Sequence, residues 1–401
     1  MLSQSTIDTV KSTAPLLGDE GERITRLFYD KLFHHHPELK NIFNMANQAK
    51  GEQARALADS VFAYARHIDE LEALGPVVKR IAHKHASLQV APEHYPIVGR
   101  YLLEAIRDHL KLHDDDPVLT AWAEAYEALA GIFIETEEGI YQANESTPGG
   151  WRGDRAFIID RVEPETDEVK SFYLRPEDGQ PIADFRPGQY VGVKTRPPSS
   201  AFDEIRQYSL SSAPGEPYYR ITVKAEGAGT SVPGHVSNFL HDASVGDRVW
   251  LRPPTGDFVV EKRSERPVLI GGGIGITPLV SMLLNAVRQG RNLEHLVFIH
   301  CCRDRSHHVM HDDLRALSAQ KGFKYYVAYE QGEGADHLGY LDTAILGNWL
   351  PFEGRGDVYL CGPTAFMSGL NILLKRMGYA DEQLHYEIFG PRIRFSEASW
   401  H

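Results

Sequence analysis

The first third of the chain carries a helical pattern of apolar residues that runs, with interruptions, from Ser3 to Tyr141. The interruptions coincide with residues suited to a helix end or a first helical turn, namely Gly18, Pro37, Gly51, Pro76, Pro92 and Pro117. This spacing predicts helices over residues 3–17, 20–35, 37–43, 51–68, 76–88, 92–110 and 117–142. We therefore expect an all-α domain at the amino terminus.

After Tyr141 the helical pattern stops at a polar segment rich in Gly and Pro, NESTPGGWRGD, which is typical of a linker between domains. The apolar residues that follow alternate with period two, and Pro and Gly interrupt them. Six segments show this pattern: RAFIIDRV, VKSFYLRP, QYVGVKT, QYSLSS, YYRITVKAE and DRVWLRPP. They predict six short strands in a small antiparallel β-barrel.

The last third alternates short apolar strands with amphipathic helices. PVLIGG precedes TPLVSMLLNAV, LVFIHCC precedes DDLRALSAQ, and DVYLCG precedes TAFMSGLNILLKRM, with a further strand at KYYVAYE. This order predicts a parallel sheet wrapped by helices, an α/β fold. A chain of 401 residues has room for three domains. We expect their bounds at 1–146, 147–264 and 265–401.

Composition narrows the possible partners and the compartment. A net charge of −13, without a concentrated stripe of Lys and Arg, argues against nucleic acid as a partner and against stable membrane association. The amino terminus lacks a cationic segment followed by an apolar run, so we expect a soluble, cytoplasmic protein. Three cysteines without C-x-x-C spacing predict neither a disulfide framework nor an iron–sulfur cluster.

One histidine stands out on the predicted helix 76–88. Helical spacing places His85 on the same stripe as Val78, Ile81 and Leu88. A neutral imidazole on an apolar face is able to hold a haem iron and leave the other iron face open. The alternative is a core histidine that is hydrogen-bonded to a backbone carbonyl.

Two further polar residues lie on apolar helix faces. Tyr29 shares its face with Phe28, Leu32 and Phe33, and Gln53 shares another with an apolar stripe that includes Leu57. Such groups are either satisfied core polar residues or hydrogen-bond donors above the open side of a haem.

The order of these residues resembles the globin domain of the flavohaemoglobins, a family of bacterial and fungal flavohemoproteins. The resemblance implies haem b, with His85 as the proximal iron ligand. It implies that Tyr29 and Gln53 line the distal pocket and that Phe43 packs against the porphyrin. Leu57 is implied as a further cofactor contact, and Lys84 is implied at the haem–flavin junction. It further implies a relay from the proximal histidine through Tyr95 to Glu135, in which a carboxylate pushes electron density onto the iron.

Glu135 is supported by its own helix, because it follows Ala128 and Ile132 on a stripe of small apolar residues. Glu137 and Glu138 are expected to be solvated. The alternative for Glu135 is an ordinary surface residue near a helix end.

The predicted barrel contains Arg206, Gln207, Tyr208 and Ser209 on one strand. An R-x-Y-S segment resembles the flavin signature of the ferredoxin reductase superfamily. The resemblance implies that Arg206 contacts the FAD pyrophosphate, Tyr208 packs on the isoalloxazine and Ser209 lies near its reactive nitrogen. Further flavin contacts are implied at Tyr190 and at Ser237, the latter in a segment that opens a short helix. The alternative is a barrel with ordinary edge residues.

Two loops of the α/β part resemble the nicotinamide-binding loops of the same superfamily. The first joins a strand to a helix and consists of Gly271, Gly272, Gly273, Ile274, Gly275, Ile276 and Thr277. Its glycines would let the backbone approach a pyrophosphate at the helix amino terminus. The second contains Cys361 and Gly362 and follows another strand.

The carboxyl-terminal segment resembles the family's closing segment, in which an aromatic residue covers the flavin and a Glu lies nearby. It comprises Glu387, Ile388, Phe389, Gly390 and Pro391. The coenzyme preference stays open, since Arg303 and Arg305 suit a 2′-phosphate whereas Asp304 between them opposes it.

Taken together, the resemblance to the flavohaemoglobins implies nitric oxide dioxygenase activity. NAD(P)H would reduce FAD, FAD would reduce the haem, and the haem with O2 would convert nitric oxide to nitrate. The expected partners are these small molecules, with no obligate protein partner. The alternative is an NAD(P)H-dependent flavin or ferric reductase whose globin binds or senses O2 or nitric oxide.

Overall fold

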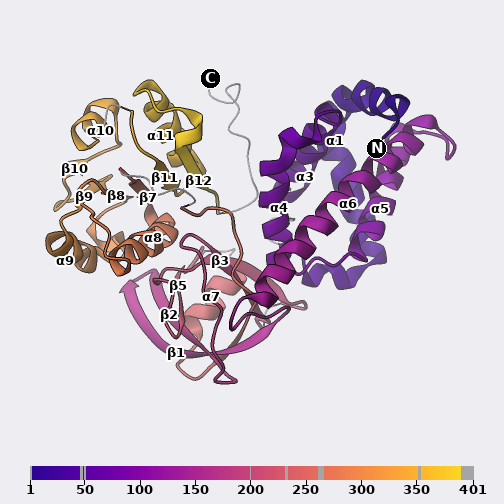
Figure 1. The fold of residues 1–401 in the computed structure, drawn as a ribbon. Coiled ribbons are helices and arrows are strands. Elements are labelled where there is room, and N and C mark those ends of the chain that lie inside the picture. The colour runs from indigo at the N-terminus through magenta and orange to yellow at the C-terminus, as the bar shows by residue number, and fades with distance from the viewer. Residues whose placement is uncertain are drawn as a thin grey trace. The chain divides into compact units, whose positions relative to one another are not determined.

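The computed structural model describes residues 2–45, 48, 51–198, 200–230, 234–260, 266–350 and 354–389 (Figure 1). The chain divides into two compact units. One consists of Met1–Thr147, Trp151–Gly153 and Lys194–Arg206, and the other of Pro148–Gly150, Asp154–Val193 and Gln207–His401. The predicted order of a helical domain, an antiparallel sheet and a parallel α/β domain is confirmed.

The amino-terminal part is helical, as predicted. Its elements are α1 (Gln4–His35), η1 (Pro37–Asn41), α3 (Glu52–Arg66), η2 (Leu71–Leu74), α4 (Gly75–Ser87), α5 (His94–Leu110) and α6 (Pro117–Ser146). Pro occupies the first turn of α4 and of α6, where its missing N–H costs no helical hydrogen bond. Asp116 caps α6, since its side chain accepts from the N–H of Val118 at 2.9 Å.

The prediction of two helices over 3–17 and 20–35 is wrong, because α1 continues through both Pro15 and Gly18. Gly18 and Gly21 serve a close approach of α1 to α3 and not a helix end. A Cβ on Gly18 would lie 3.0 Å from the Phe62 ring, and one on Gly21 would lie 3.1 Å from the Ala58 Cβ. Packing of an unbroken apolar face therefore outweighs the local signal of these two residue types.

The middle part is an antiparallel sheet of six strands in the order β4-β3-β6-β1-β2-β5. These strands are β1 (Arg155–Thr166), β2 (Val169–Pro176), β3 (Tyr190–Thr195), β4 (Glu204–Ser209), β5 (Tyr219–Lys224) and β6 (Arg248–Leu251), with α7 (His235–Asp242) before β6. Just after β4, Leu210 forms an antiparallel bridge with Ile221 of β5. The two edge strands, β4 and β5, thus meet at this bridge, so some backbone groups that an open sheet edge would expose are paired.

The carboxyl-terminal part is a parallel sheet in the order β10-β9-β8-β7-β11-β12. Its strands are β7 (Val268–Gly272), β8 (Val297–Cys302), β9 (Lys324–Tyr329), β10 (His337–Leu338), β11 (Val358–Cys361) and β12 (Leu384–Glu387). Its helices are η3 (Gly273–Gly275), α8 (Ile276–Arg288), η4 (Arg305–His307), α9 (His311–Lys321), α10 (Thr343–Trp349), α11 (Thr364–Arg376) and η5 (Asp381–Gln383).

Alternate residues of these strands enter two different cores. One core joins Phe298 of β8 to Leu279 of α8 and Leu314 of α9. The other joins Ile299 of the same strand to helices α10 and α11. The sheet is therefore covered on both faces, as expected for near-continuous apolar strands.

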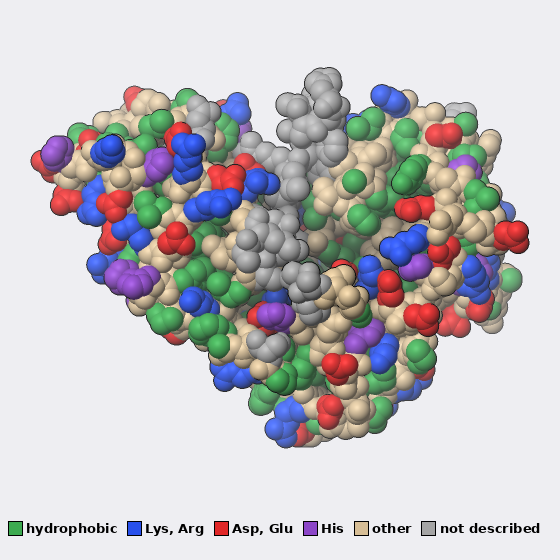
Figure 2. All heavy atoms as spheres, turned by 180° about the vertical axis from the view of Figure 1, so that it is seen from behind, with side chains coloured by type: hydrophobic (Ala, Val, Ile, Leu, Met, Phe, Trp, Pro, Cys, Tyr) green, Lys and Arg blue, Asp and Glu red, His purple; other side chains and the backbone are tan. Residues whose placement is uncertain are grey.

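Helix length and surface charge both bear on contact with a membrane. None of the helices in the described chain is both long and apolar enough to cross a bilayer. On the face in Figure 2, basic and acidic side chains are interspersed.

We expect Gly275→Ala to destabilise the parallel-sheet domain by about 1–3 kcal/mol, the usual cost of overpacking. A Cβ on Gly275 would lie 2.3 Å from the carbonyl oxygen of Cys361 and would push β7 and β11 apart. Denaturant unfolding monitored by circular dichroism measures the effect. Gly369→Ala is the control, because Gly369 lies on α11 with open space at its Cβ. Equal stability of the two variants would contradict this account.

Candidate functional site

His85 on α4 is held by side chains from two other helices. Its Nδ1 lies 2.7 Å from Oε1 of Glu137 on α6 and 3.2 Å from the hydroxyl of Tyr95 on α5. The Tyr95 hydroxyl itself donates to the same Glu137 oxygen at 2.5 Å. Phe133 packs beside the imidazole, with 5.5 Å between the ring centroids. Three helices thus fix the orientation of one imidazole ring.

These contacts determine which imidazole nitrogen is available. Because a carboxylate accepts and the Tyr95 proton is already donated to it, Nδ1 of His85 carries the proton that points at Glu137. In the neutral ring the lone pair is then on Nε2, which makes no hydrogen bond within the described residues. The His85 side chain is 31% exposed, so the imidazole is not sealed within the core.

Glu137, and not Glu135, makes these hydrogen bonds, although the family resemblance, supported by the helix pattern, assigned the relay carboxylate to Glu135. Glu137 is 2% exposed, whereas Glu135 is exposed to solvent. The prediction that Glu137 would be solvated is also wrong. The pattern did contain a signal, since Ala130, Phe133, Glu137 and Tyr141 share the buried stripe of α6.

The phenol of Tyr29 lies in an aromatic cluster. Its ring centroid is 4.7 Å from that of Phe28, 5.7 Å from Phe33 and 5.8 Å from Phe43. Burial raises the pKa of Tyr29, and a hydrogen bond from the Gln53 side chain opposes this rise. The hydroxyl therefore stays protonated at neutral pH and remains a donor. Tyr29 and Gln53, which are far apart in sequence, are brought together.

Gln53 also has an unused acceptor. Its Oε1 is buried and has no hydrogen-bond partner among the described residues. A buried amide oxygen without a partner is costly unless a bound group satisfies it. Phe43, Leu57 and Lys84 are each partly buried, and the first two pack against the hydrophobic core of the helical part.

Arg206 on β4 is anchored by an acidic neighbour that sequence analysis did not single out. Its Nη2 lies 3.0 Å from Oε2 of Glu204, and the two side chains are 20% and 5% exposed. Its Nη1 donates to the carbonyl of Ile205 at 2.8 Å. Ser209 at the end of β4 is buried, whereas Gln207 and Tyr208 are partly buried. The guanidinium is thus pre-oriented, as anion recognition requires.

Ser237 lies in the first turn of α7, where its hydroxyl organises the local backbone. It accepts from the N–H of Glu226 at 3.2 Å and donates to the carbonyl of Gly234 at 3.4 Å. The predicted short helix at this position is therefore present.

The glycine loop and the Cys361 segment lie on adjacent strands of the parallel sheet. In register, Glu387 of β12 pairs with Cys361 of β11, Cys361 with Gly271 of β7, and Gly271 with His300 of β8. The strand order reverses between β7 and β11. In open parallel sheets, the crevice at such a reversal is where ligands bind.

The loop between β7 and α8 leaves its backbone accessible at one point. Gly273 has φ +52° and open space where a Cβ would stand. Ile274 is partly buried, and Gly271, Gly272, Gly275, Ile276 and Thr277 are buried. Thr277 closes the turn by donating to the carbonyl of Ile274 at 3.1 Å. This cradle at a helix amino terminus suits a pyrophosphate.

Glu387 acts on both neighbouring sites through its charge. Burial raises the pKa of Tyr190, and the Glu387 charge raises it further. The same two causes raise the pKa of the Cys361 thiol. Tyr190 and the segment around Cys361 and Gly362 are therefore brought near β12. Ile388 is partly buried, Phe389 is 47% exposed, and Gly390 and Pro391 lie outside the described residues.

The fold and these sites define a class, an oxidoreductase that joins a globin to a ferredoxin reductase-like module. Family models agree with the two ends of this description. A globin model matches residues 26–133, and an oxidoreductase NAD-binding domain model matches residues 269–371.

Full-length relatives identify the family. A flavohemoprotein of Halalkalibacterium halodurans is 45% identical over 401 residues, with 97% of each chain covered. A flavohemoprotein of Pseudomonas aeruginosa is 44% identical, with 98% of each chain covered. This chain belongs to the flavohemoprotein family.

Solved structures show the same architecture. A flavohemoglobin from Malassezia yamatoensis, described with bound FAD and heme, superposes with a TM-score of 0.86 at 26% identity and covers 97% of this chain and 100% of its own. The FAD/NAD binding domain of a nitric oxide dioxygenase from Vibrio cholerae superposes with a TM-score of 0.56 at 38% identity. That match covers 59% of this chain and 99% of the other.

We expect Glu137→Ala to destabilise the helical domain by about 1–3 kcal/mol, because His85 and Tyr95 would lose their shared acceptor. Glu135→Ala is the matched control on the same helix and should change stability by less than about 0.5 kcal/mol. Urea unfolding followed by circular dichroism compares them. A larger loss for Glu135→Ala would restore the assignment made from sequence.

Proposed function

We propose that this protein is a nitric oxide dioxygenase that consumes NAD(P)H and O2 and forms nitrate. The observation that carries the proposal is the hydrogen-bonded group of His85, Tyr95 and Glu137 in a chain that also contains a reductase module. A globin that only stores oxygen needs neither a carboxylate behind its histidine nor a reductase.

The redox balance of this reaction requires the reductase. Converting nitric oxide to nitrate removes three electrons from nitrogen, whereas reducing O2 fully takes four. One further electron is therefore needed for each nitric oxide, and one NAD(P)H supplies two. Two nitric oxide, two O2 and one NAD(P)H thus yield two nitrate, one NAD(P)+ and one proton.

The residues present fit the two prosthetic groups that this reaction needs. Nε2 of His85, which makes no hydrogen bond within the described residues, would hold the haem iron, and the buried hydroxyl of Tyr29, which stays protonated, would donate to a ligand bound there. Haem b would supply the iron chemistry that activates O2, and FAD would supply the conversion of a hydride into single electrons.

On the proximal side, Glu137 takes the role that sequence analysis gave to Glu135. By accepting from Nδ1–H, its carboxylate gives the imidazole partial imidazolate character and makes Nε2 a stronger donor. Tyr95 holds that carboxylate in place. On the distal side, Tyr29 and Gln53 provide hydrogen bonds to developing negative charge. Phe43 and Leu57 would contact the haem, and Lys84 would lie at the haem–flavin junction.

In the reductase module, Arg206 would hold the FAD pyrophosphate, and the residues that would contact the flavin nucleotide are Tyr190, Gln207, Tyr208, Ser209 and Ser237. The loop from Gly271 to Thr277 would hold the NAD(P)H pyrophosphate. Cys361 and Gly362 would flank the nicotinamide, and the segment that begins at Glu387 would cover the flavin. The register of Glu387, Cys361 and Gly271 across the sheet supports this arrangement.

We further propose that the chain works as three domains, at 1–146, 147–264 and 265–401, without an obligate protein partner. The element boundaries support this division, since α6 ends at Ser146 and β7 begins at Val268. Three free thiols and the use of NAD(P)H favour the cytoplasm as the compartment.

The function is tested by following nitric oxide in aerobic solution with NADH and protein loaded with haem and FAD. We expect rapid loss of nitric oxide with near-stoichiometric nitrate, and no nitrate when O2 is removed. In His85→Ala, nitric oxide consumption should fall to background while NADH-dependent ferricyanide reduction persists.

His83→Ala, on the same helix, is the control and should retain both activities. The alternative function, a flavin or ferric reductase with an incidental globin, predicts fast NADH oxidation with nitric oxide left unchanged in the wild type. That result would replace the dioxygenase proposal.

Arg206→Ala should weaken FAD binding about 10- to 100-fold, because a charge-assisted contact is worth about 1.5–3 kcal/mol. Titration of the flavin-free protein with FAD, followed by flavin fluorescence, gives the dissociation constant. Arg175→Ala removes an equal charge from an exposed pair with Asp160 in the same sheet and should leave FAD affinity unchanged. Equal weakening in both variants would rule out a specific role for Arg206.

A further inference from the structure

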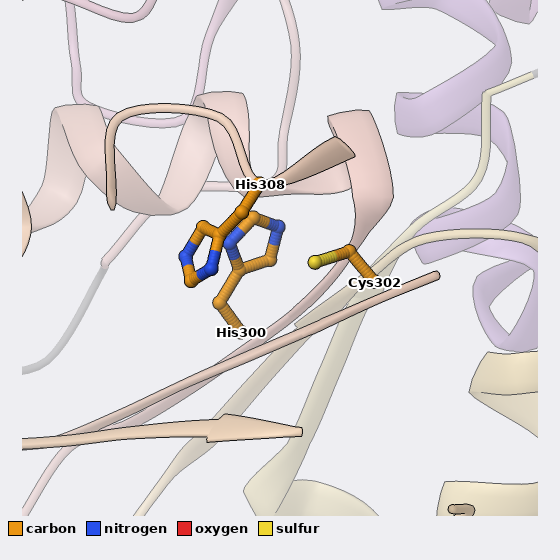
Figure 3. Close-up of side chains that lie close together, drawn as sticks. All are labelled: His300, Cys302 and His308. Carbon is orange, nitrogen blue, oxygen red and sulfur yellow. The ribbon is translucent and has the colours of Figure 1, made fainter. Parts of the chain in front are cut away.

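A buried cluster of metal-ligating side chains, none of which is assigned above to a cofactor, lies in the parallel-sheet domain. His300, Cys302 and His308 each offer one ligand atom, and these atoms all lie within 4.8 Å of one another. Figure 3 shows the two imidazoles close together with the Cys302 sulfur beside them. Their exposed fractions are 0%, 8% and 3%.

The strand pattern explains why two of these residues converge. His300 and Cys302 are two positions apart on β8 and therefore face the same side of the sheet. Cys302 belongs to the core beneath α8 and α9. Cys301, between them, packs with the opposite core. His308 follows η4 and returns to the same side, with its ring centroid 4.5 Å from that of His300.

The hydrogen bonds of His300 leave one nitrogen ready for a ligand. Its Nε2 lies 3.1 Å from the carbonyl of Gly273, which only accepts, so Nε2 carries the proton. The lone pair is then on Nδ1. That atom is buried and has no hydrogen-bond partner within the described chain. A histidine oriented through one nitrogen by a backbone carbonyl, with the other nitrogen free, has the usual geometry of a metal ligand.

The protonation states suit a cation as well. Burial lowers the pKa of His300 to about 4, and burial also lowers that of His308, so both rings are neutral at pH 7. Burial raises the pKa of the Cys302 thiol to about 12, so this sulfur is protonated unless a cation binds. Binding would form one metal–sulfur bond, break the S–H bond and release one proton to solvent.

His308 has phenols on both sides. The Tyr329 hydroxyl is 2.7 Å from its Nδ1, and the Tyr325 hydroxyl is 2.7 Å from its Nε2. A bound cation would displace one phenol and leave the other to orient the ring. His311 lies against this ring, with centroids 4.2 Å apart. The nearby cations Arg305 and Arg315 are paired with carboxylates of Asp312 and Asp336 at 2.7 Å, which offsets their repulsion of an ion.

We propose that His300, Cys302 and His308 form a zinc-binding site. One thiolate and two neutral imidazoles match the ligand preference of Zn2+, which in open sites takes three protein ligands and leaves the fourth position for water or another group. Through the His300–Gly273 hydrogen bond, the site is connected to the glycine loop of the nucleotide domain.

The test is equilibrium dialysis of the full-length protein, loaded with haem and FAD, against buffered Zn2+, followed by X-ray absorption at the zinc edge. Neither iron nor flavin contributes at that edge. We expect one zinc per chain, with one sulfur at about 2.3 Å and nitrogens at about 2.0–2.1 Å. Zinc bound only by nitrogen and oxygen, or no zinc bound at micromolar free Zn2+, would overturn the proposal.

Substitutions separate this site from surface binding. Cys302→Ser should weaken zinc binding at least 100-fold, and His308→Ala should do the same. Cys301→Ser removes the adjacent thiol on the opposite face of the sheet and should leave affinity within about twofold. Circular dichroism and FAD content establish that each variant is folded. Unchanged zinc affinity in folded Cys302→Ser would also refute the site, whatever His308→Ala does.

Discussion

The helical part of this protein depends on one buried carboxylate oxygen. Glu137 is almost without solvent contact, and a charge in such a place is tolerated only when donors surround it. His85 from α4 and Tyr95 from α5 provide them, so three helices must meet at this atom. Gly99 allows the approach, since a Cβ there would lie 2.4 Å from the Tyr126 ring of α6. The same contact that stabilises the carboxylate fixes the tautomer of the histidine.

The parallel sheet brings backbone and side chains from distant segments of the chain together at the carboxyl ends of its strands. The reversal of strand order between β7 and β11 leaves their carboxyl ends side by side. The absence of a side chain on Gly275 lets the loop after β7 touch the end of β11. Glu387 on β12 extends that row, and its charge reaches both Tyr190 and Cys361. Through its place beside β11, Glu387 is thus close to both a proposed flavin contact, Tyr190, and a proposed nicotinamide contact, Cys361.

One strand of this sheet also separates two chemically identical thiols. Cys301 and Cys302 are neighbours in sequence, yet they belong to opposite cores because side chains alternate along β8. Only Cys302 shares a face with His300, and the return of the chain after η4 adds His308. The hydrogen bond from His300 to Gly273 connects this cluster with the nucleotide loop. The alternation of side chains along β8 and the return of the chain after η4 together bring His300, Cys302 and His308 into one cluster. Their spacing in the sequence alone does not indicate this cluster.

Periodicity and glycine placement are local properties, so the sequence alone predicted the three kinds of fold, the six strands of the antiparallel sheet, and β7, β8, β9 and β11 of the parallel sheet. It also predicted the motifs around His85, Arg206, Gly271 and Cys361. It missed β10 and β12, which are short strands at the two edges of the parallel sheet. Tertiary packing decided the rest. It extended α1 through Pro15 and Gly18, since contact with α3 outweighs local helix-breaking tendencies. It selected Glu137 over Glu135, since only the former points into the space between α4, α5 and α6. A helix pattern gives a residue its face, whereas the neighbouring helices decide which polar group on that face has donors within reach.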